Sequence, residues 1–239
     1  MATRPLPQHI SKQFDKELED LRSRVMIMGG LVEDLLSKSL NALEQGDIEL
    51  AETVSTSDYQ VNALEVGIDE ECTQVLARRQ PAAGDLRLVL AVIKTISDLE
   101  RIGDEIEKIA KMVAYINEKG SPKSYYISVF SMGQHVQQML HEALDVFARM
   151  DSQKAVEVAA EDERIDKEYS AILRQLITYM MEDPRSITNV LDVVWAVRAL
   201  ERIGDHANNI CENVIYLVEG KDVRHTSIED IRNEISTDT

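Results

Sequence analysis

The chain has 239 residues, of which 44% are apolar and 5% aromatic, so it is long enough for one large domain or two small ones with buried cores. Its formal net charge of −17 repels phosphate backbones, which argues against nucleic-acid binding and favours cations or a basic partner surface. The N-terminal segment lacks a secretory signal, no apolar run is long enough to span a membrane, and both cysteines lie in apolar segments; we therefore expect a reduced, cytoplasmic protein without membrane insertion.

Long amphipathic helices are predicted along the whole chain. In the first of them, apolar residues recur every three or four positions from Leu18 to Leu40. The residues "QGD" break this pattern, and Asp47 is the predicted N-cap of the next helix. The predicted helices cover residues 11–45, 47–79 and 85–117 of the first half, and 125–149, 152–181 and 185–218 of the second.

The second half repeats the first. Residues 28–58 align without a gap to residues 132–162 at an offset of 104, and the hexapeptide "LERIGD" occurs at 99–104 and again at 200–205, at an offset of 101. The second half has therefore lost three residues between these blocks. Deletions fall in connections, so the "QPAAGD" and "EDPRS" segments are predicted loops.

These patterns predict an all-α fold of two tandem, sequence-related, antiparallel three-helix bundles. Short connections make consecutive helices antiparallel neighbours. The segment "EKGSPKS" is the predicted domain boundary. The predicted parts are residues 1–119 for the first bundle, 120–220 for the second, and 221–239 for an acidic C-terminal tail that we expect to be frayed or disordered.

The repeated hexapeptide places two carboxylates one helical turn apart in each half. Glu100 and Asp104 form one such pair, and Glu201 and Asp205 the other. Both pairs lie off the predicted core stripe, so we expect them on side or outer helix faces, where they could bind a divalent or iron cation, with Asn209 extending the second pair. The helical glycines between them, at 103 and 204, predict close approach of a neighbouring helix or a bound species.

A plainer interpretation remains open at this point. Carboxylates at this spacing are common on solvated helix faces, where Arg101 and Arg198 would supply ion pairs, and an exact repeat can be inherited by duplication. A second polar stripe is interpreted as solvated, because only part of it recurs in the second half, as Asp162 and Asp166. This stripe consists of Asp58, Asn62, Glu65 and Asp69.

The doubled "LERIGD", the "MGGLVE" segment and the "RQP…DLR" turn resemble the PhoU family of bacterial phosphate-transport accessory proteins, over nearly the whole chain. The resemblance implies a PhoU-like fold, similar to that of spectrin repeats, with metal at Glu100, Asp104, Glu201 and Asp205. It also implies a homodimeric, non-enzymatic regulator of phosphate uptake. Such a regulator represses the phosphate-starvation response as an adaptor between the transporter ATPase PstB and the sensor kinase PhoR.

A second hypothesis comes from a different class of protein. The carboxylate pairs could serve a metal-dependent phosphoester hydrolase. The sequence favours the adaptor, because it lacks the Glu-x-x-His pairs of di-iron bundle enzymes and any nucleophile, phosphate-loop or redox motif.

Overall fold

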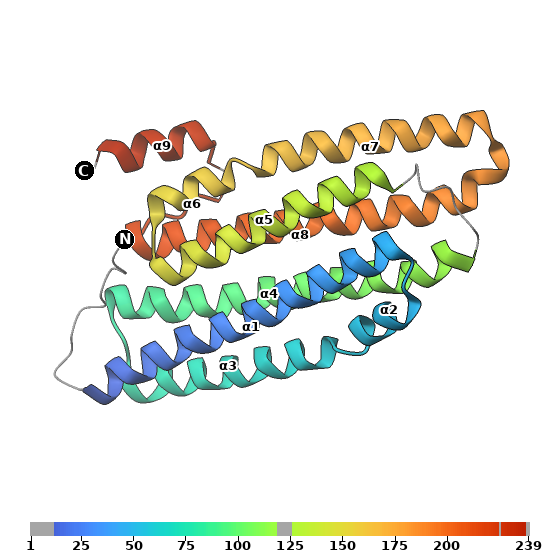
Figure 1. The fold of residues 1–239 in the computed structure, drawn as a ribbon. Coiled ribbons are helices and arrows are strands. Elements are labelled where there is room, and N and C mark those ends of the chain that lie inside the picture. The colour runs from blue at the N-terminus through green and yellow to red at the C-terminus, as the bar shows by residue number, and fades with distance from the viewer. Residues whose placement is uncertain (1–11, 119–125, 225, 238–239) are drawn as a thin grey trace.

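The structure is a computed structural model that describes residues 12–118, 126–224 and 226–237 (Figure 1). These residues fold into helices without any strand, as predicted. The predicted domain boundary at residues 119–120 lies outside the described residues. The helices are α1 Lys12–Gln45, α2 Ile48–Ser55, α3 Asp58–Arg79, α4 Ala83–Glu118, α5 Ile127–Arg149, α6 Ser152–Ala159, α7 Asp162–Glu182, the 3-10 turn η2 Pro184–Ser186, α8 Ile187–Glu219 and α9 Ile228–Thr237.

The predicted second helix of each half is broken into two. Asp47 caps α2 as predicted, since its Oδ1 accepts a hydrogen bond from the Leu50 amide at 3.0 Å. The break then falls at Thr56 and Ser57, whose hydroxyls donate to carbonyls of the preceding turn at 2.9 and 2.6 Å and so compete with helix continuation. The second half breaks at the equivalent place, so α3 and α7 both begin with an aspartate.

The two bundles pack side by side about an approximate two-fold axis (Figure 1). The first bundle comprises α1 to α4 and the second α5 to α8. Helices α4 and α8 run antiparallel through the centre of the molecule, and α1 packs against α5. The buried side chains of both bundles form one continuous hydrophobic cluster, so the repeats share a core.

Apolar residues at helical spacing build this core. Leu99, Ile102 and Ile106 of α4 are at most 1% exposed, and Leu200 and Ile203 of α8 are fully buried. Each such side chain contributes about 1.5–3 kcal/mol through the hydrophobic effect. The other residues of α4 and α8 face α3 and α7 or the other bundle.

A polar cluster interrupts the seam between α4 and α8. Asp98 Oδ1 lies 3.0 Å from His206 Nδ1 and accepts a hydrogen bond of 3.0 Å from Asn209 Nδ2, while Asp98 Oδ2 accepts one of 3.4 Å from Asn213 Nδ2. His206 and Asn213 are 7% and 6% exposed. The donors on α8 therefore satisfy a carboxylate of α4 within the interface between the bundles, which fixes how the two central helices align.

The expectation of a frayed or disordered tail is wrong for residues 228–237, which form α9. Ser227 caps the start of the helix: its Oγ accepts from the Asp230 amide at 3.2 Å and donates to Asp230 Oδ2 at 2.6 Å. Val223 and Ile231 are 4% and 3% exposed and anchor the segment. Helix α9 lies beside α6 at one end of the second bundle (Figure 1). Among the described residues, no helix is long and apolar enough to span a membrane.

Candidate functional site

The two predicted carboxylate pairs occupy equivalent places on the central helices, but their exposure differs. Glu100 and Asp104 of α4 are half-buried. On α8, Asp205 is exposed, whereas Glu201 is only 8% exposed. The prediction that both pairs face outward is therefore wrong for Glu201, because α7 packs over that side of α8.

Helix α3 brings a second set of polar side chains against the first pair. Asp58, the first residue of α3, lies so close to α4 that its Oδ1 would be 3.0 Å from a Cβ added at Gly103. This Oδ1 atom and Asn62 Oδ1 are buried and have no hydrogen-bond partner among the described residues. The interpretation of this stripe as solvated is thus wrong for Asp58 and Asn62, whereas Asp69 is exposed as interpreted. The predicted close approach at Gly103 is confirmed. We call Asp58, Asn62, Glu65, Glu100 and Asp104 the first carboxylate cluster.

Burial and mutual repulsion both disfavour the charged forms in this cluster. The pKa of Asp58 is raised mainly by burial, and the charges of Asp104 and Glu107 raise it further. The pKa of Glu100 is raised by burial and then by Asp104, Glu65 and Asp58. These carboxylates therefore lie in an environment that a bound cation would relieve.

The second bundle repeats the arrangement. Asp162, the first residue of α7, stands opposite Gly204, where a Cβ would lie 3.8 Å from Asp162 Oδ1 and 3.2 Å from Ile165 Cδ1. The predicted close approach at this glycine is therefore confirmed as well. We call Asp162, Asp166, Glu201, Asp205 and Glu212 the second carboxylate cluster.

The pKa of Asp162 is strongly raised. Burial, followed by the charges of Asp205, Asp166, Glu201 and Glu212, raises its pKa from 3.8 to about 7. The pKa of Asp205 is raised by burial and by Asp166, and that of Glu201 by burial and by Asp205. Strongly raised carboxyl pKa values are typical of sites prepared for a cation or a proton.

Glu201 leaves one of its oxygens unused. Its Oε1 accepts a hydrogen bond of 2.5 Å from Arg198, while Oε2 is buried without a hydrogen-bond partner in the described part of the chain. A buried carboxylate oxygen without a donor is costly, and a bound cation would satisfy it. The predicted ion pair of Arg198 with Glu201 is present, so both the plain and the metal-binding interpretation find support here.

The structure does not bring Asn209 to the second cluster. Its amide nitrogen donates to Asp98 at the α4–α8 seam, as described above, so its side chain turns toward the first bundle. The neighbouring Asn208 instead carries a buried carbonyl oxygen, Oδ1, that has no hydrogen-bond partner among the described residues. On geometry, Asn208 replaces Asn209 as the amide of this cluster.

The clusters have the composition of a cation site but are not closed around one. Within the described ranges, no three Asp, Glu, His or Cys side chains converge closely enough to hold a metal ion. Hard cations need six or more oxygens at short distance, so side-chain movement or water would have to complete the shell. The fit rests on the raised carboxyl pKa values and on the unused oxygens of Asp58, Asn62, Glu201 and Asn208.

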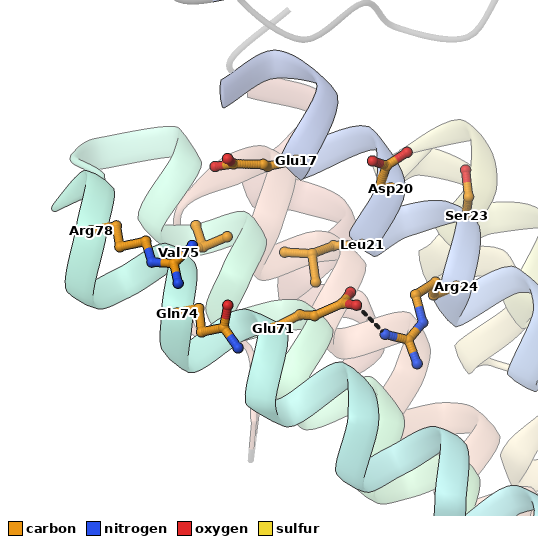
Figure 2. A pocket seen from close by; sticks show the side chains of 9 residues that line it. All are labelled: Glu17, Asp20, Leu21, Ser23, Arg24, Glu71, Gln74, Val75 and Arg78. Atoms are coloured by element: carbon orange, nitrogen blue, oxygen red, sulfur yellow. Dashed lines mark ion pairs between the residues drawn. The ribbon is translucent and has the colours of Figure 1, made fainter. Parts of the chain in front are cut away.

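A separate groove runs between α1 and α3 at the far side of the first bundle (Figure 2). Its volume is about 490 Å³, and ion pairs cross it or border it: Arg24 with Glu71, and Arg79 with Glu17 at 2.7 Å. Figure 2 shows the ion pair between Arg24 of α1 and Glu71 of α3, with Leu21 of α1 beside it. Its lining residues are Glu17, Asp20, Leu21, Ser23, Arg24, Glu71, Gln74, Val75 and Arg78, and none of them belongs to a carboxylate cluster.

Known proteins resemble the chain along most of its length. The PhoU domain matches residues 25–113 and 129–214, one copy in each bundle. A phosphate-specific transport system accessory protein PhoU homolog from Pseudomonas aeruginosa is 52% identical over 230 residues, which cover 96% of this chain and 95% of that protein. The accessory protein PhoU of Escherichia coli is 48% identical over 228 residues, covering 95% and 93%.

Solved structures agree with these sequence matches. The crystal structure of PhoU from Pseudomonas aeruginosa superposes with a TM-score of 0.85 at 53% identity, covering 87% of this chain and all of that one. The phosphate transport system regulatory protein PhoU from Streptococcus pneumoniae gives a TM-score of 0.82 at 35% identity, covering 88% and 99%.

Proposed function

This chain belongs to the PhoU family, and from that membership we propose that it is an accessory protein of a phosphate-specific transport system. In this role it regulates phosphate uptake and represses the phosphate-starvation response when phosphate is plentiful. The observation that carries the proposal is the near full-length identity of about half with transport accessory proteins, across both repeats.

The proposed mode of action is that of an adaptor. Its partners are the transporter ATPase, PstB, and the sensor kinase, PhoR, which it engages in the cytoplasm as a homodimer. Long helices with exposed faces and a net charge of −17 suit docking to basic partner surfaces. A pulldown with purified PstB and PhoR, with and without phosphate, tests this; retention of neither partner under either condition would contradict it.

We also propose that each carboxylate cluster binds a divalent or iron cation. Asp58, Glu100 and Asp104 would supply oxygens in the first bundle, and Asp162, Glu201 and Asp205 in the second. A bound cation would supply positive charge to groups that now repel one another. The support is the repeated geometry, the raised carboxyl pKa values and the unused buried oxygens.

The regulatory role is tested in cells. In a bacterium whose own PhoU gene is deleted, phosphate-scavenging genes should be active in phosphate-rich medium, and expression of this chain should silence them. Reporter activity measured at high and low phosphate gives the answer. If the chain is stably produced and the reporter remains fully active at high phosphate, it does not have the proposed function.

One observation favours the alternative of a metal-dependent phosphoester hydrolase. Asp162, with a pKa of about 7, would be able to accept or donate a proton near neutral pH beside side chains suited to a cation. Turnover of p-nitrophenyl phosphate by the protein in Mn²⁺, compared with an Asp162→Asn variant, decides this. Turnover that the substitution abolishes would establish the hydrolase, and equal background rates would exclude it.

A further inference from the structure

One contact divides the outer face of the hairpin formed by α7 and α8. The Arg198 guanidinium of α8 lies over the Tyr169 ring of α7, 5.7 Å from its centroid. Because the 3-10 turn η2 joins the two helices, they run antiparallel, and residues at helical spacing from this contact form matching rows on both of them. The rows that lead toward η2 are apolar, and the rows that lead away from it are acidic.

Large apolar side chains are exposed on the half of this face toward η2. They lie on rows that continue from Tyr169 along α7 in steps of four residues, and from Arg198 along α8 in steps of three or four, so they share one face. An exposed group of such side chains marks an interaction surface. We call this group the hairpin apolar face: Ile177, Met181, Ile187, Leu191 and Trp195, of which Trp195 is 61% exposed.

The first bundle does not share this face, although its helices are equivalent. At the offsets of the repeat, 104 on α3 and 101 on α4, three members of the face are replaced by Thr73, Ala77 and Lys94. The equivalent helices of the first bundle therefore pack without apolar side chains at these places. Packing within the bundle does not account for the apolar residues of the second copy, whereas a ligand on its outer face does.

The half of the face that leads away from η2 carries carboxylates of the second cluster. Asp166 and Asp205 are exposed there, and neither forms an ion pair with a described residue. The basic side chains at this end, Arg198 and Arg202, are already paired with glutamates at 2.5 and 3.0 Å. Burial and the charge of Asp166 raise the pKa of Asp205, so positive charge brought by a ligand is favoured here.

An amphipathic helix with basic residues at one end fits both halves of the face. From Ile187 to Asp205 the face extends about 27 Å along α8, which is the length of a helix of about 18 residues. A second copy of this chain fits less well, because 43 acidic residues against 26 basic ones make the copies repel one another. The same charge disfavours an anionic lipid surface.

We propose that the outer face of the α7–α8 hairpin is a docking site for a basic amphipathic helix of a partner protein. Apolar side chains of that helix cover Trp195 and its neighbours, and Lys or Arg side chains pair with Asp166 and Asp205. The inference rests on the adaptor role proposed above and assigns docking to the second bundle. The two repeats, alike in fold, then differ in what they bind.

Trp195 is the only tryptophan of the chain, so its fluorescence reports on this face. The probe is a peptide of about 18 residues without aromatic side chains, with leucines at helical spacing in one half and lysines in the other, made in both orders. It is added to the full chain in chelator. The peptide should shift the Trp195 emission to shorter wavelength, and a control peptide with glutamates in place of lysines should not. Absence of a shift, or equal shifts with the two peptides, would overturn the proposal.

Other occupants of this face give different signals. If a second copy covers it, the Trp195 emission shifts when the protein concentration alone is raised, and light scattering shows a doubled mass. If a lipid surface covers it, vesicles of phosphatidylcholine with phosphatidylglycerol shift the emission and the lysine peptide does not. Either result overturns docking of a partner helix.

Substitutions on α7 test the apolar half. Ile177→Thr with Met181→Ala gives α7 the side chains that the first bundle has at these places, and it keeps Trp195 as the reporter. Both side chains are exposed, so the fold should be retained, which circular dichroism verifies. Binding of the lysine peptide should weaken about ten-fold, because apolar anchors carry most of the energy of such an interface. Unchanged affinity would overturn the proposal.

Neutral substitutions test the acidic half. Asp166→Asn with Asp205→Asn should weaken binding of the lysine peptide several-fold, since two exposed ion pairs are lost. The matched control, Asp34→Asn with Glu44→Gln, neutralises two exposed carboxylates of α1 and should leave the affinity nearly unchanged. Equal losses in the two variants would mean that the peptide is attracted by the overall charge rather than by this face, and would overturn the proposal.

The docking face and the adaptor role fail in distinguishable ways. In the pulldown with PstB and PhoR, the variant Ile177→Thr with Met181→Ala should lose at least one partner that the wild-type chain retains. If wild type and variant retain the same partners, docking lies elsewhere, so the proposed face is overturned while the adaptor role stands. Retention of neither partner by the wild-type chain overturns the adaptor role and, with it, the docking face.

Discussion

Leu144 of α5 packs directly onto Gly29 of α1, where an added Cβ would lie only 2.6 Å from Leu144 Cδ2. The repeat makes the same contact in the opposite direction: Leu40 of α1 lies on Gly133 of α5, with a distance of 2.5 Å from the added Cβ to Leu40 Cδ2. Each bundle thus inserts a leucine into a space that a glycine leaves on the other. These reciprocal contacts set how closely α1 and α5 approach.

Substitution of these glycines should therefore destabilise the protein. Alanine at a helical glycine gains about 1 kcal/mol of helix propensity, but overpacking a buried contact costs about 1–3 kcal/mol. We expect Gly29→Ala to lower the free energy of unfolding by about 1 kcal/mol, measured by urea denaturation.

The neighbouring glycine provides the matched control. Gly30 is exposed, and an added Cβ there would meet nothing within 4 Å, so Gly30→Ala should raise the free energy of unfolding by up to about 1 kcal/mol. Leu144→Ala should make Gly29→Ala harmless in a double-mutant cycle. Equal free energies of unfolding for the Gly29 and Gly30 variants would show that α1 and α5 accommodate the added Cβ without loss of stability.

Removing the charges of one cluster should remove its cation. Glu100→Gln with Asp104→Asn is expected to reduce the metal content per chain by roughly half, and adding Glu201→Gln with Asp205→Asn should abolish it, because neutral amides are poorer ligands for hard cations. Elemental analysis of the purified proteins measures this, and circular dichroism verifies that the helices remain. A quadruple variant that retains the wild-type metal content would mean that these carboxylates do not bind metal and are solvated residues that recur only because the chain was duplicated.

The raised pKa of Asp162 predicts a pH-dependent stability in metal-free protein. Its folded pKa of about 7 lies above its ordinary value of 3.8, so between these values the folded state binds more protons than the unfolded state. The contribution of this group to stability is therefore present below about pH 4 and is lost as the pH rises to about 7. Asp162→Asn should be more stable than wild type by about 1–2 kcal/mol at pH 8, after allowance for solvent screening.

Urea unfolding of both proteins in chelator at pH 4.5 and pH 8 checks this sign. The advantage of the variant should shrink at the lower pH, where wild-type Asp162 is protonated when folded. Adding Mn²⁺ at pH 8 should reverse the order, because only the wild type gains a ligand. An advantage that is the same at both pH values would contradict a raised pKa.

The polar seam predicts a large loss on substitution of one carboxylate. Asp98→Ala removes the acceptor of Asn209 and Asn213 and the partner of His206, and it should lower the free energy of unfolding by about 2–4 kcal/mol. Asp34→Ala removes a carboxylate from an exposed pair with Lys38 and should cost less than about 1 kcal/mol. Comparable losses in the two variants would show that burial does not strengthen the interactions of Asp98 beyond those of an exposed ion pair.

Apolar periodicity predicted the long helices because burial of one face per helix determines where these helices form. It missed the break between α2 and α3, before Asp58. The apolar spacing continues through both helices, so it does not reveal that the helical backbone is interrupted there. It also missed α9, although "SIED" begins with a typical N-cap residue and Ile228 and Ile231 supply apolar spacing. The many charged and polar residues of this segment suggested disorder, although a few local contacts are enough to form the helix.

The sequence predicted only the part of the candidate site that lies on α4 and α8, for a related reason. The pairs on α4 and α8 were found because their hexapeptide is repeated without change. Their partners on α3 and α7 diverged: at the offset of 104, Asp58 recurs as Asp162 and Asn62 is replaced by Asp166, but the later residues of the stripe are not polar in the second half. Which polar stripe faces another helix depends on tertiary packing, which spacing within one helix does not contain. For the same reason Asn209 was assigned to the wrong neighbour.

The reciprocal leucine–glycine contacts have a consequence for the origin of the molecule. In a symmetric dimer, a contact of residue i in one subunit with residue j in the other is always accompanied by the contact of residue j in the first with residue i in the second. Leu40 with Gly133 and Leu144 with Gly29 obey this rule within a single chain, and α4 and α8 meet as equivalent helices would across a two-fold axis. The present chain thus has the architecture of an ancestral homodimer of half its length, whose subunits became covalently joined. Joining them freed the seam to become asymmetric, with Glu105 on one side and its counterpart His206 on the other.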